Sequence, residues 1–358
     1  MIIIYTICLL SLSIYSYALI DPNLTLVNHP LFEQFRNTMV QLGYHNRGIS
    51  IIVYLTLITF LFVLNYFFTN KYKRINVIKL SLLTGGLLLL SYPFLSHDFF
   101  NYLFDAKIVT IYHQNPWTHR ALDFPNDSWL RFMHWTHRTY PYGPTWLIIS
   151  LFPSIISFGK LILNFIFFKA LFVSFYLAIV YFINKINKKA AVFFATHPLV
   201  IIEGLVSSHN DLIAVALAIA GIYYLSRKDL LARLFFLVST GIKFITAPLI
   251  FIDKNNVKVI IIGISVLIVY VSITGEIQPW YFVNLFIFLP YLLNIIEKFN
   301  FFLLGLLVSY YPYIYLGGWD SEDKIIIKHK IIGIFFVLNL FLLLKNKIDL
   351  KNYLNLKR

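Results

Sequence analysis

Asp98, Tyr102 and Asp105 are spaced so that one face of a helix would carry all three side chains. They occupy positions i, i+4 and i+7, which share a face wherever the chain is helical. A carboxylate in a partly apolar cleft has a raised pKa and can accept a proton from a substrate hydroxyl. We therefore predict that Asp98 is a catalytic base and that Tyr102 binds substrate beside it. Asp105 is a further candidate for substrate binding, although a solvated helix end explains it better, and the same alternative is open for Asp98.

Lys243 lies near the middle of the apolar run 230–252. A charged side chain at such a place needs a partner or water. It could extend toward the lipid headgroups as a structural residue, but we favour the interpretation that it binds a lipid phosphate. Arg138, next to the turn Tyr140-Pro141-Tyr142, is a second candidate for the phosphate, and His209 is a weaker third.

Further polar and aromatic residues are candidates for substrate binding. The candidates are Asn115, Tyr142, Asn210, Asp211, Trp280 and Tyr281. Aromatic rings stack on sugar faces, and the alternative for Trp280 and Tyr281 is an aromatic belt at the membrane surface. Five of the ten histidines fall between His97 and His137, but no HExxH-type motif accompanies them. We therefore predict no dedicated metal site and no cofactor, and leave a divalent cation open.

The composition defines the class of protein. Of the 358 residues, 59% are hydrophobic and 13% charged, and apolar runs of about 17–25 residues, enough to cross a bilayer, recur along the chain. The formal charge is +14, but the lysines cluster in short links between apolar runs, which is the positive-inside pattern, so nucleic acid is not a predicted partner. The single cysteine, Cys8, excludes an intramolecular disulfide. We predict an all-α, polytopic membrane bundle that forms one domain over residues 1–358.

The basic links also predict the topology. If the links 71–74 and 184–189 both lie on the cytoplasmic side, the run 142–158 cannot cross the membrane. We therefore predict a dipping or interfacial segment, broken by Pro144 and Pro153. By the same argument, the run 230–252 is a hairpin of two short helices with Lys243 near its tip.

This topology has about ten full spans and two partial ones. The largest outer loop is 96–141, and both termini lie inside, including the basic tail that ends at Arg358. Residues 1–20 lack a basic start, so we favour a retained membrane anchor over a cleaved signal peptide.

Several short motifs follow one another in a characteristic order. They are Asp98, Tyr102, Asn115-Pro116-Trp117, Tyr142-Gly143-Pro144, His209-Asn210-Asp211, Gly241-Ile242-Lys243 and Pro279-Trp280-Tyr281. This order, on one predicted side of the membrane, resembles the GT-C superfamily of membrane glycosyltransferases. The nearest resemblance is to the polyprenyl-phosphate-mannose-dependent α-mannosyltransferases of prokaryotic envelopes. More distantly, the order is similar to that of the first mannosyltransferase of GPI-anchor assembly.

The resemblance implies an enzyme that takes a sugar from a polyprenyl-phosphate donor and passes it to a glycan or glycolipid acceptor of the cell envelope. It implies a catalytic aspartate in the first large outer loop, which is Asp98, on the extracytoplasmic face of the cell membrane. We expect a single inverting displacement, with Lys243, Arg138 and His209 near the leaving phosphate. His97-Asp98 replaces the DxD of the family, and Trp117 stands where tyrosine is common. Metal dependence therefore does not follow from the resemblance, and mannose is only the expected sugar.

Two other classes of protein remain open. A lipid-linked-sugar transporter or flippase also uses broken helices and charges near the membrane midplane. A transporter needs ionisable groups on both sides of a central site, whereas here they gather in the segments predicted outside. A non-catalytic scaffold for envelope assembly is the third possibility.

Overall fold

Every regular element of the described chain is a helix, as predicted for an all-α protein. The computed structural model describes residues 1–253 and 255–345. The α-helices are α1 (Ile2–Tyr15), α2 (Pro30–Val40), α3 (Arg47–Asn70), α4 (Val77–Leu88), α5 (Asp98–Thr110), α6 (Pro144–Ile156), α7 (Leu161–Ile186), α8 (Lys188–Thr196), α9 (Asp211–Leu225), α10 (Asp229–Thr240), α11 (Val257–Thr274), α12 (Leu289–Ile296), α13 (Asn300–Val308) and α14 (Glu322–Lys345). Short 3-10 and π helices connect them: η1 (Ser16–Leu19), η2 (Gln41–His45), η3 (Tyr72–Arg74), η4 (Ala121–Asp123), η5 (Ser128–Phe132), η6 (Val200–Val206), η7 (Phe244–Phe251), η8 (Pro279–Phe288), η9 (Glu297–Phe299) and η10 (Pro312–Leu316).

Fewer helices than predicted are long enough to cross a membrane. By length and hydropathy, six helical segments of the described residues qualify, or seven if α8 and η6, which meet at a bend of 66°, form one span. The predicted number of about ten is therefore not confirmed. Several apolar segments fold as short helices: α4 has 12 residues, or about 18 Å at 1.5 Å per residue, less than the ~30 Å hydrocarbon core.

The predicted helix at Asp98 is formed, and one expectation for the segment after the large loop is wrong. α4 ends at Leu88, and α5 begins as a separate helix at Asp98. The i, i+4, i+7 register of the predicted site residues holds within α5. Pro153 does not break the segment after the large loop: α6 continues through it to Ile156, and its 13 residues still leave it short for a span.

The segment around Lys243 forms the predicted hairpin. α10 ends at Thr240 and η7 begins at Phe244, so Lys243 lies in the connection between the two arms. At the other end of the hairpin, Arg233 donates hydrogen bonds to the carbonyls of Ile250 (2.8 Å) and Ile252 (2.7 Å). The end of η7 therefore returns to the first turns of α10, and Lys243 is placed at the tip.

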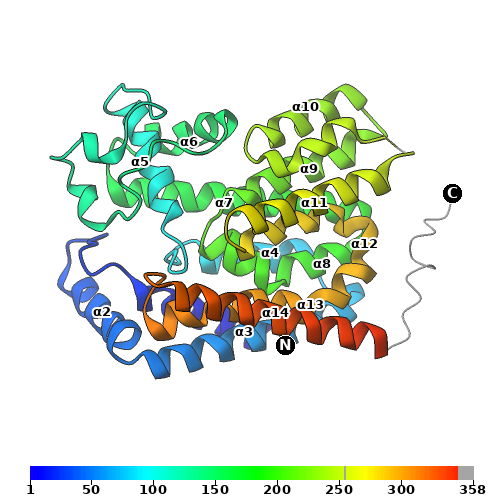
Figure 1. Cartoon of the computed structure of the whole chain (residues 1–358), viewed down its shortest axis with the longest axis horizontal. Coiled ribbons are helices and arrows are strands. Elements are labelled where there is room, and N and C mark those ends of the chain that lie inside the picture. Colours follow the sequence, from blue (N-terminus) through cyan, green and yellow to red (C-terminus); the bar gives the residue numbers. More distant parts are fainter. Residues whose placement is uncertain (254, 346–358) are drawn as a thin grey trace.

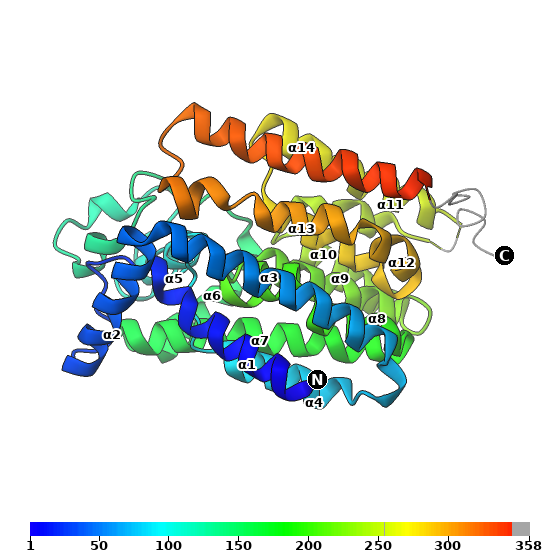
Figure 2. The same ribbon diagram turned by 90° about the horizontal axis from the view of Figure 1, so that it is seen from below.

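The two ends of the bundle carry different parts of the chain. The long helices lie along the long axis (Figure 2), with α5 and the large loop at one end and α12 at the other (Figure 1). At the α12 end, Lys188 donates to the carbonyl of Lys73 (3.2 Å) and Lys189 pairs with Glu297 (3.0 Å). The basic links predicted for the cytoplasmic side thus meet at one end. The predicted basic tail at 346–358 lies outside the described residues.

Two glycines allow the hairpin tip to pack closely against the end of the large loop. A Cβ on Gly143 would lie 2.0 Å from the carbonyl oxygen of Gly241, and a Cβ on Gly241 would lie 2.1 Å from Thr145 Oγ1. The backbone N–H of Thr145 donates to the Gly241 carbonyl (3.2 Å). Only residues without a side chain permit this approach, which brings Tyr142 and Lys243 to the same place.

Substituting Gly143→Ala should therefore lower the melting temperature of the purified protein, by an amount that corresponds to about 1–3 kcal/mol for overpacking. The matched control is Gly86→Ala, because nothing lies within 4 Å of a methyl group added at Gly86 in α4. Alanine in a helix is favoured over glycine, so the control should be neutral or slightly stabilising. Equal melting temperatures for the two variants would contradict the close contact.

Candidate active site

A cavity of about 480 Å³ lies where the start of α5, the end of the large loop and the hairpin tip meet. This volume is in the usual range of small-molecule sites. Asp98 and Lys243 both line this cavity, although they lie 145 positions apart in the chain. The other lining residues are Leu95, Ser96, His97, Trp135, Arg138, Pro141, Tyr142, Glu276, Gln278, Trp280, Tyr281, Tyr310, Tyr313, Trp319 and Ile325. The structure therefore brings the predicted base and the predicted phosphate ligand into one cavity.

Lys243 is held by a fully buried carboxylate. Its Nζ lies 3.0 Å from Oδ2 of Asp211, the first residue of α9, and Asn284 Nδ2 donates to the other oxygen of Asp211 (2.9 Å). The partial positive charge of the α9 N-terminus also favours a carboxylate there. An ammonium group has three donors, and the Lys243 side chain is 18% exposed and lines the cavity. It can therefore keep its bond to Asp211 and donate to a ligand as well.

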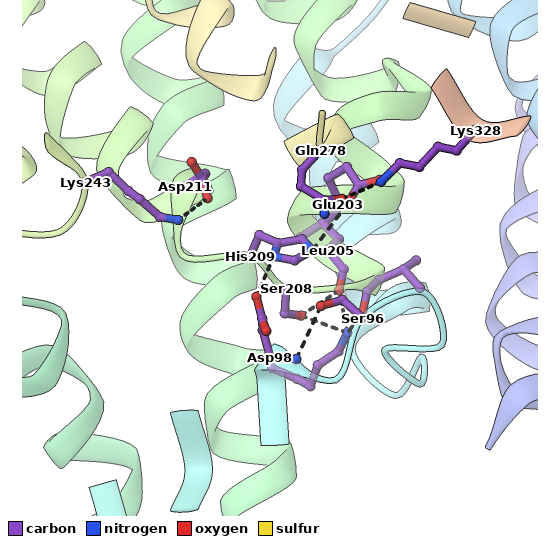
Figure 3. A network of polar contacts seen from close by, with 12 residues as sticks. Ser96, Asp98, Glu203, Leu205, Ser208, His209, Asp211, Lys243, Gln278 and Lys328 are labelled. Atoms are coloured by element: carbon purple, nitrogen blue, oxygen red, sulfur yellow. Dashed lines mark hydrogen bonds and ion pairs between the residues drawn. The ribbon is translucent and has the colours of Figure 1, made fainter. Parts of the chain in front are cut away.

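Asp98 faces His209, and His209 faces a second carboxylate, Glu203 (Figure 3). The distances are 3.9 Å from Asp98 Oδ2 to His209 Nδ1 and 3.4 Å from His209 Nε2 to Glu203 Oε2. The imidazole stacks on the Trp280 ring, with centroids 4.0 Å apart. Burial raises the pKa of the Asp98 carboxyl, and the charges of Lys243 and Arg138 reverse only part of the rise. Asp98 is thus a stronger base than an ordinary aspartate.

A buried lysine fixes the two segments that carry Asp98 and His209. Lys169 of α7 is 1% exposed and donates to Ser91 Oγ (3.0 Å), which lies ahead of α5. It also donates to the carbonyls of Leu205 and Val206 and to Ser208 Oγ, next to His209. Ser208 Oγ also donates to the Leu205 carbonyl (3.0 Å), so the lysine and the serine together supply donors to the end of η6, where an unpaired carbonyl would be costly in an apolar setting.

The remaining predicted site residues divide into two groups. Tyr142, Trp280, Tyr281 and Arg138 line the cavity, with the Arg138 guanidinium 3.9 Å from the centre of the Trp135 ring. Tyr102 and Asn210 are buried behind the cavity wall, and the Tyr102 ring packs against Tyr142 with centroids 5.0 Å apart. Asn115 and Asp105 do not line the cavity; Asn115 lies in an exposed turn, where its Oδ1 accepts a hydrogen bond from the Trp117 N–H (3.0 Å).

The histidines of the large loop do not converge on one point. His97 stacks on His134 with ring centroids 3.5 Å apart, and His134 Nε2 lies 3.5 Å from Asp21 Oδ2. Burial and the neighbouring His134 lower the pKa of His97 to about 3, so the ring is neutral. Within residues 1–253 and 255–345, no group of three or more His, Cys, Asp or Glu side chains could hold a metal ion.

The sequence analysis missed several residues of the site. Glu203 and Lys169 are charged residues within apolar runs, and that signal alone could have selected them. Glu276, Gln278 and Trp319 line the cavity from two loops in the last third of the chain. Loop residues of this kind carry no such signal, because only the fold brings them to the cavity.

The apolar helices indicate a polytopic membrane protein, and a cavity lined by carboxylates and cations lies at one end of its bundle. Residues 6–254 match the MptA_B family, alpha-(1->6)-mannopyranosyltransferase, N-terminal domain. This is more than half of the chain, so the protein belongs to that family and is a membrane mannosyltransferase of the GT-C type. No curated protein and no solved structure matches the chain.

The family membership confirms the predicted resemblance and the predicted enzyme class, in place of the transporter and scaffold alternatives. The matched residues include Asp98, Arg138, His209 and Lys243. Glu276, Gln278 and Trp280 follow the matched segment in the chain.

The substitution Asp105→Asn should stabilise the protein as the pH rises. Burial, with a smaller contribution from the Asp98 charge, raises the pKa of Asp105 to about 8. An acid whose pKa is higher in the folded than in the unfolded state loses stability between those two values, here between about pH 4 and pH 8. The gain in melting temperature of the variant should therefore grow over this range and then level off.

The control for that measurement is Asp123→Asn. Asp123 is exposed and pairs with Arg120, and a hydrogen bond from the Arg120 backbone N–H helps to hold the pKa of Asp123 below its ordinary value. Its substitution should give no gain at any pH. A pH-independent difference between wild type and Asp105→Asn would show that Asp105 is not a buried, unpaired acid.

Proposed function

We propose that this membrane mannosyltransferase moves a mannosyl group from a polyprenyl-phosphate donor to an envelope glycan or glycolipid on the extracytoplasmic face of the cell membrane. The observation that carries the proposal is the shared cavity of Asp98 and Lys243. Asp98 supplies a basic carboxylate, and Lys243 with Arg138 supplies positive charge for a phosphate at the same place.

The reaction is a single displacement. The Asp98 carboxylate accepts the proton of an acceptor hydroxyl as its oxygen attacks the anomeric carbon. The bond from that carbon to the phosphate oxygen breaks, polyprenyl phosphate leaves, and the anomeric configuration inverts. Lys243 and Arg138 donate hydrogen bonds to the leaving phosphate as its negative charge grows. His209 orients the Asp98 carboxylate, because its Nδ1 faces Asp98 and its Nε2 faces Glu203. It is buried and does not line the cavity, so this scheme leaves the phosphate to Lys243 and Arg138.

An apolar cavity of about 370 Å³ offers a place for the polyprenyl chain. It is lined by residues of α11, η8, α12, α13 and α14, including Phe282, Leu285 and Phe336. Trp280 and Tyr281 of the active-site cavity belong to the same helix η8 as Phe282 and Leu285. A lipid chain in this groove would have its phosphate directed along η8 toward Lys243. In this scheme the two cationic side chains provide the positive charge, and no step uses a divalent ion.

Asp98→Asn should reduce sugar transfer by about 100-fold or more, the usual contribution of a general base. The amide keeps the shape of the side chain, so expression and donor binding should be unchanged. In the wild type, transfer should also decline in acid as the pH falls through the raised pKa of Asp98. The assay follows release of polyprenyl phosphate from polyprenyl-phosphate mannose in the presence of acceptor.

The control is Asp229→Asn, a 65% exposed carboxylate that pairs with Arg233 at the base of the hairpin. Its turnover should equal that of the wild type. An Asp98→Asn variant with normal turnover would refute the assignment of the base.

Lys243→Ala should weaken the binding of polyprenyl phosphate by roughly ten- to a hundredfold, since hydrogen bonds to charged groups contribute about 1.5–3 kcal/mol. The control is Lys160→Ala, which removes an exposed lysine at the start of α7. Binding is measured by titration of the purified protein with a short-chain polyprenyl phosphate. Unchanged affinity in Lys243→Ala would contradict a role for Lys243 in binding the phosphate.

A further inference from the structure

We infer that the active-site cavity contains a second subsite, formed by Glu276, Gln278 and Trp319, that binds the acceptor as a neutral pyranoside through adjacent hydroxyl groups. The inference rests on the proposed function, because it assumes that the same cavity performs the transfer. It adds the residues that hold the acceptor and the way in which they recognise its hydroxyl groups.

A buried lysine outside the cavity orients the two polar residues. Lys328 of α14 is 1% exposed, and its Nζ lies 2.6 Å from Glu276 Oε1 and 2.9 Å from Gln278 Oε1. An ammonium group can only donate, so the amide oxygen of Gln278 must face it. The Gln278 NH₂ group and the second oxygen of Glu276 are thereby left for other partners. Both side chains line the cavity.

The Gln278 NH₂ group and the second carboxylate oxygen of Glu276 suit the hydroxyl groups of a sugar. They offer amide donors from Gln278 beside a carboxylate acceptor from Glu276, and neither Gln278 Nε2 nor Glu276 Oε2 has a hydrogen bond within the described residues. A sugar hydroxyl both donates and accepts, so two adjacent hydroxyls can use both groups at once. A site built in this way rejects ligands that lack the hydroxyl, because its own groups then stay unpaired.

An aromatic wall completes the subsite. Trp319 stacks on Tyr313 with ring centroids 5.6 Å apart and an interplanar angle of 19°, and both residues line the cavity. Lys328 Nζ lies 4.8 Å from the centre of the Trp319 ring, so the same ammonium group contacts Trp319, Glu276 and Gln278. The apolar face of a pyranose ring packs on such a surface while its hydroxyls reach the polar groups.

The charges of the cavity separate the two substrates. Lys243 lies on one side of Asp98 and His209, and Gln278 with Lys328 lies on the other (Figure 3). The Glu276 carboxylate is already paired with Lys328, so this side has no positive charge left for a phosphate. Lys243 and Arg138 provide it on the other side, and Arg138 has no ion pair with a carboxylate within the described residues. The donor phosphate therefore belongs to the Lys243 side and the uncharged acceptor to the Glu276 side. Asp98 lies between them, where an acceptor hydroxyl must lose its proton.

The test uses the full-length protein with polyprenyl-phosphate mannose and a panel of methyl pyranosides, namely the α-mannoside, α-glucoside and α-galactoside. Gln278→Leu should raise the KM for the best acceptor about tenfold or more, the effect of a lost hydrogen bond and an unpaired hydroxyl. The KM for the donor should not change. The control is Gln34→Leu, which removes an exposed amide on α2 and should alter neither value.

A second arm uses monodeoxy derivatives of the best acceptor. In the wild type, at least one deoxy compound should bind about tenfold more weakly than the parent. In Gln278→Leu that penalty should disappear, because the partner of the missing hydroxyl has already been removed. A loss of folding would instead weaken all acceptors and the donor alike.

Three outcomes would overturn the inference. If the wild type transfers mannose but Gln278→Leu keeps the same acceptor KM, the subsite is elsewhere and the proposed function stands. If polyprenyl phosphate is released but no pyranoside accepts the sugar, the chemical class of the acceptor is wrong. If the wild type neither transfers mannose nor releases polyprenyl phosphate, the proposed function fails and the subsite fails with it.

Discussion

The ion pair between Lys243 and Asp211 is the interaction on which the arrangement of the site depends. Asp211 is fully buried at the start of α9, and the tip of a hairpin supplies its cation. Removing one partner of such a pair typically costs about 3–5 kcal/mol, because the other charge is left without compensation. This cost keeps the hairpin tip packed against α9. The end of the large loop is positioned as well, because Gly143 contacts Gly241 of the hairpin tip. One buried carboxylate thus positions two walls of the cavity, the hairpin tip and the end of the large loop.

Breaks in the helices and buried lysines occur together around this cavity. A broken helix exposes backbone carbonyls that must find donors where water is scarce. Lys169 satisfies those at the end of η6, and Lys243 occupies the break between α10 and η7. Lys328 orients the loop that follows α11. Each ammonium group allows the chain to leave regular helix at a point where a polar side chain is needed, and so converts a strongly apolar bundle into a site with fixed donors and acceptors.

The sequence predicts the parts of this arrangement that have a local or charge-balance signature. The hairpin at Lys243 follows from the charges of the flanking links, and the shared face of Asp98 and Tyr102 follows from helical spacing. The number of spans does not follow, because hydropathy does not reveal that a segment such as α4 stops after 12 residues. Ion pairs between residues distant in the chain, such as Lys328 with Glu276, also cannot be predicted from the sequence, since nothing near either residue indicates its partner.

The central claim is that the donor phosphate lies between Lys243 and Asp98 at the end of the bundle that carries the large loop. The most direct measurement is an experimental structure of the protein with a polyprenyl phosphate bound. The account predicts phosphate oxygens in hydrogen-bond contact with Lys243 Nζ and the Arg138 guanidinium, the lipid chain along η8, and Asp98 facing the same space. A phosphate bound instead among Lys73, Lys188 and Lys189, at the opposite end of the bundle, would contradict it.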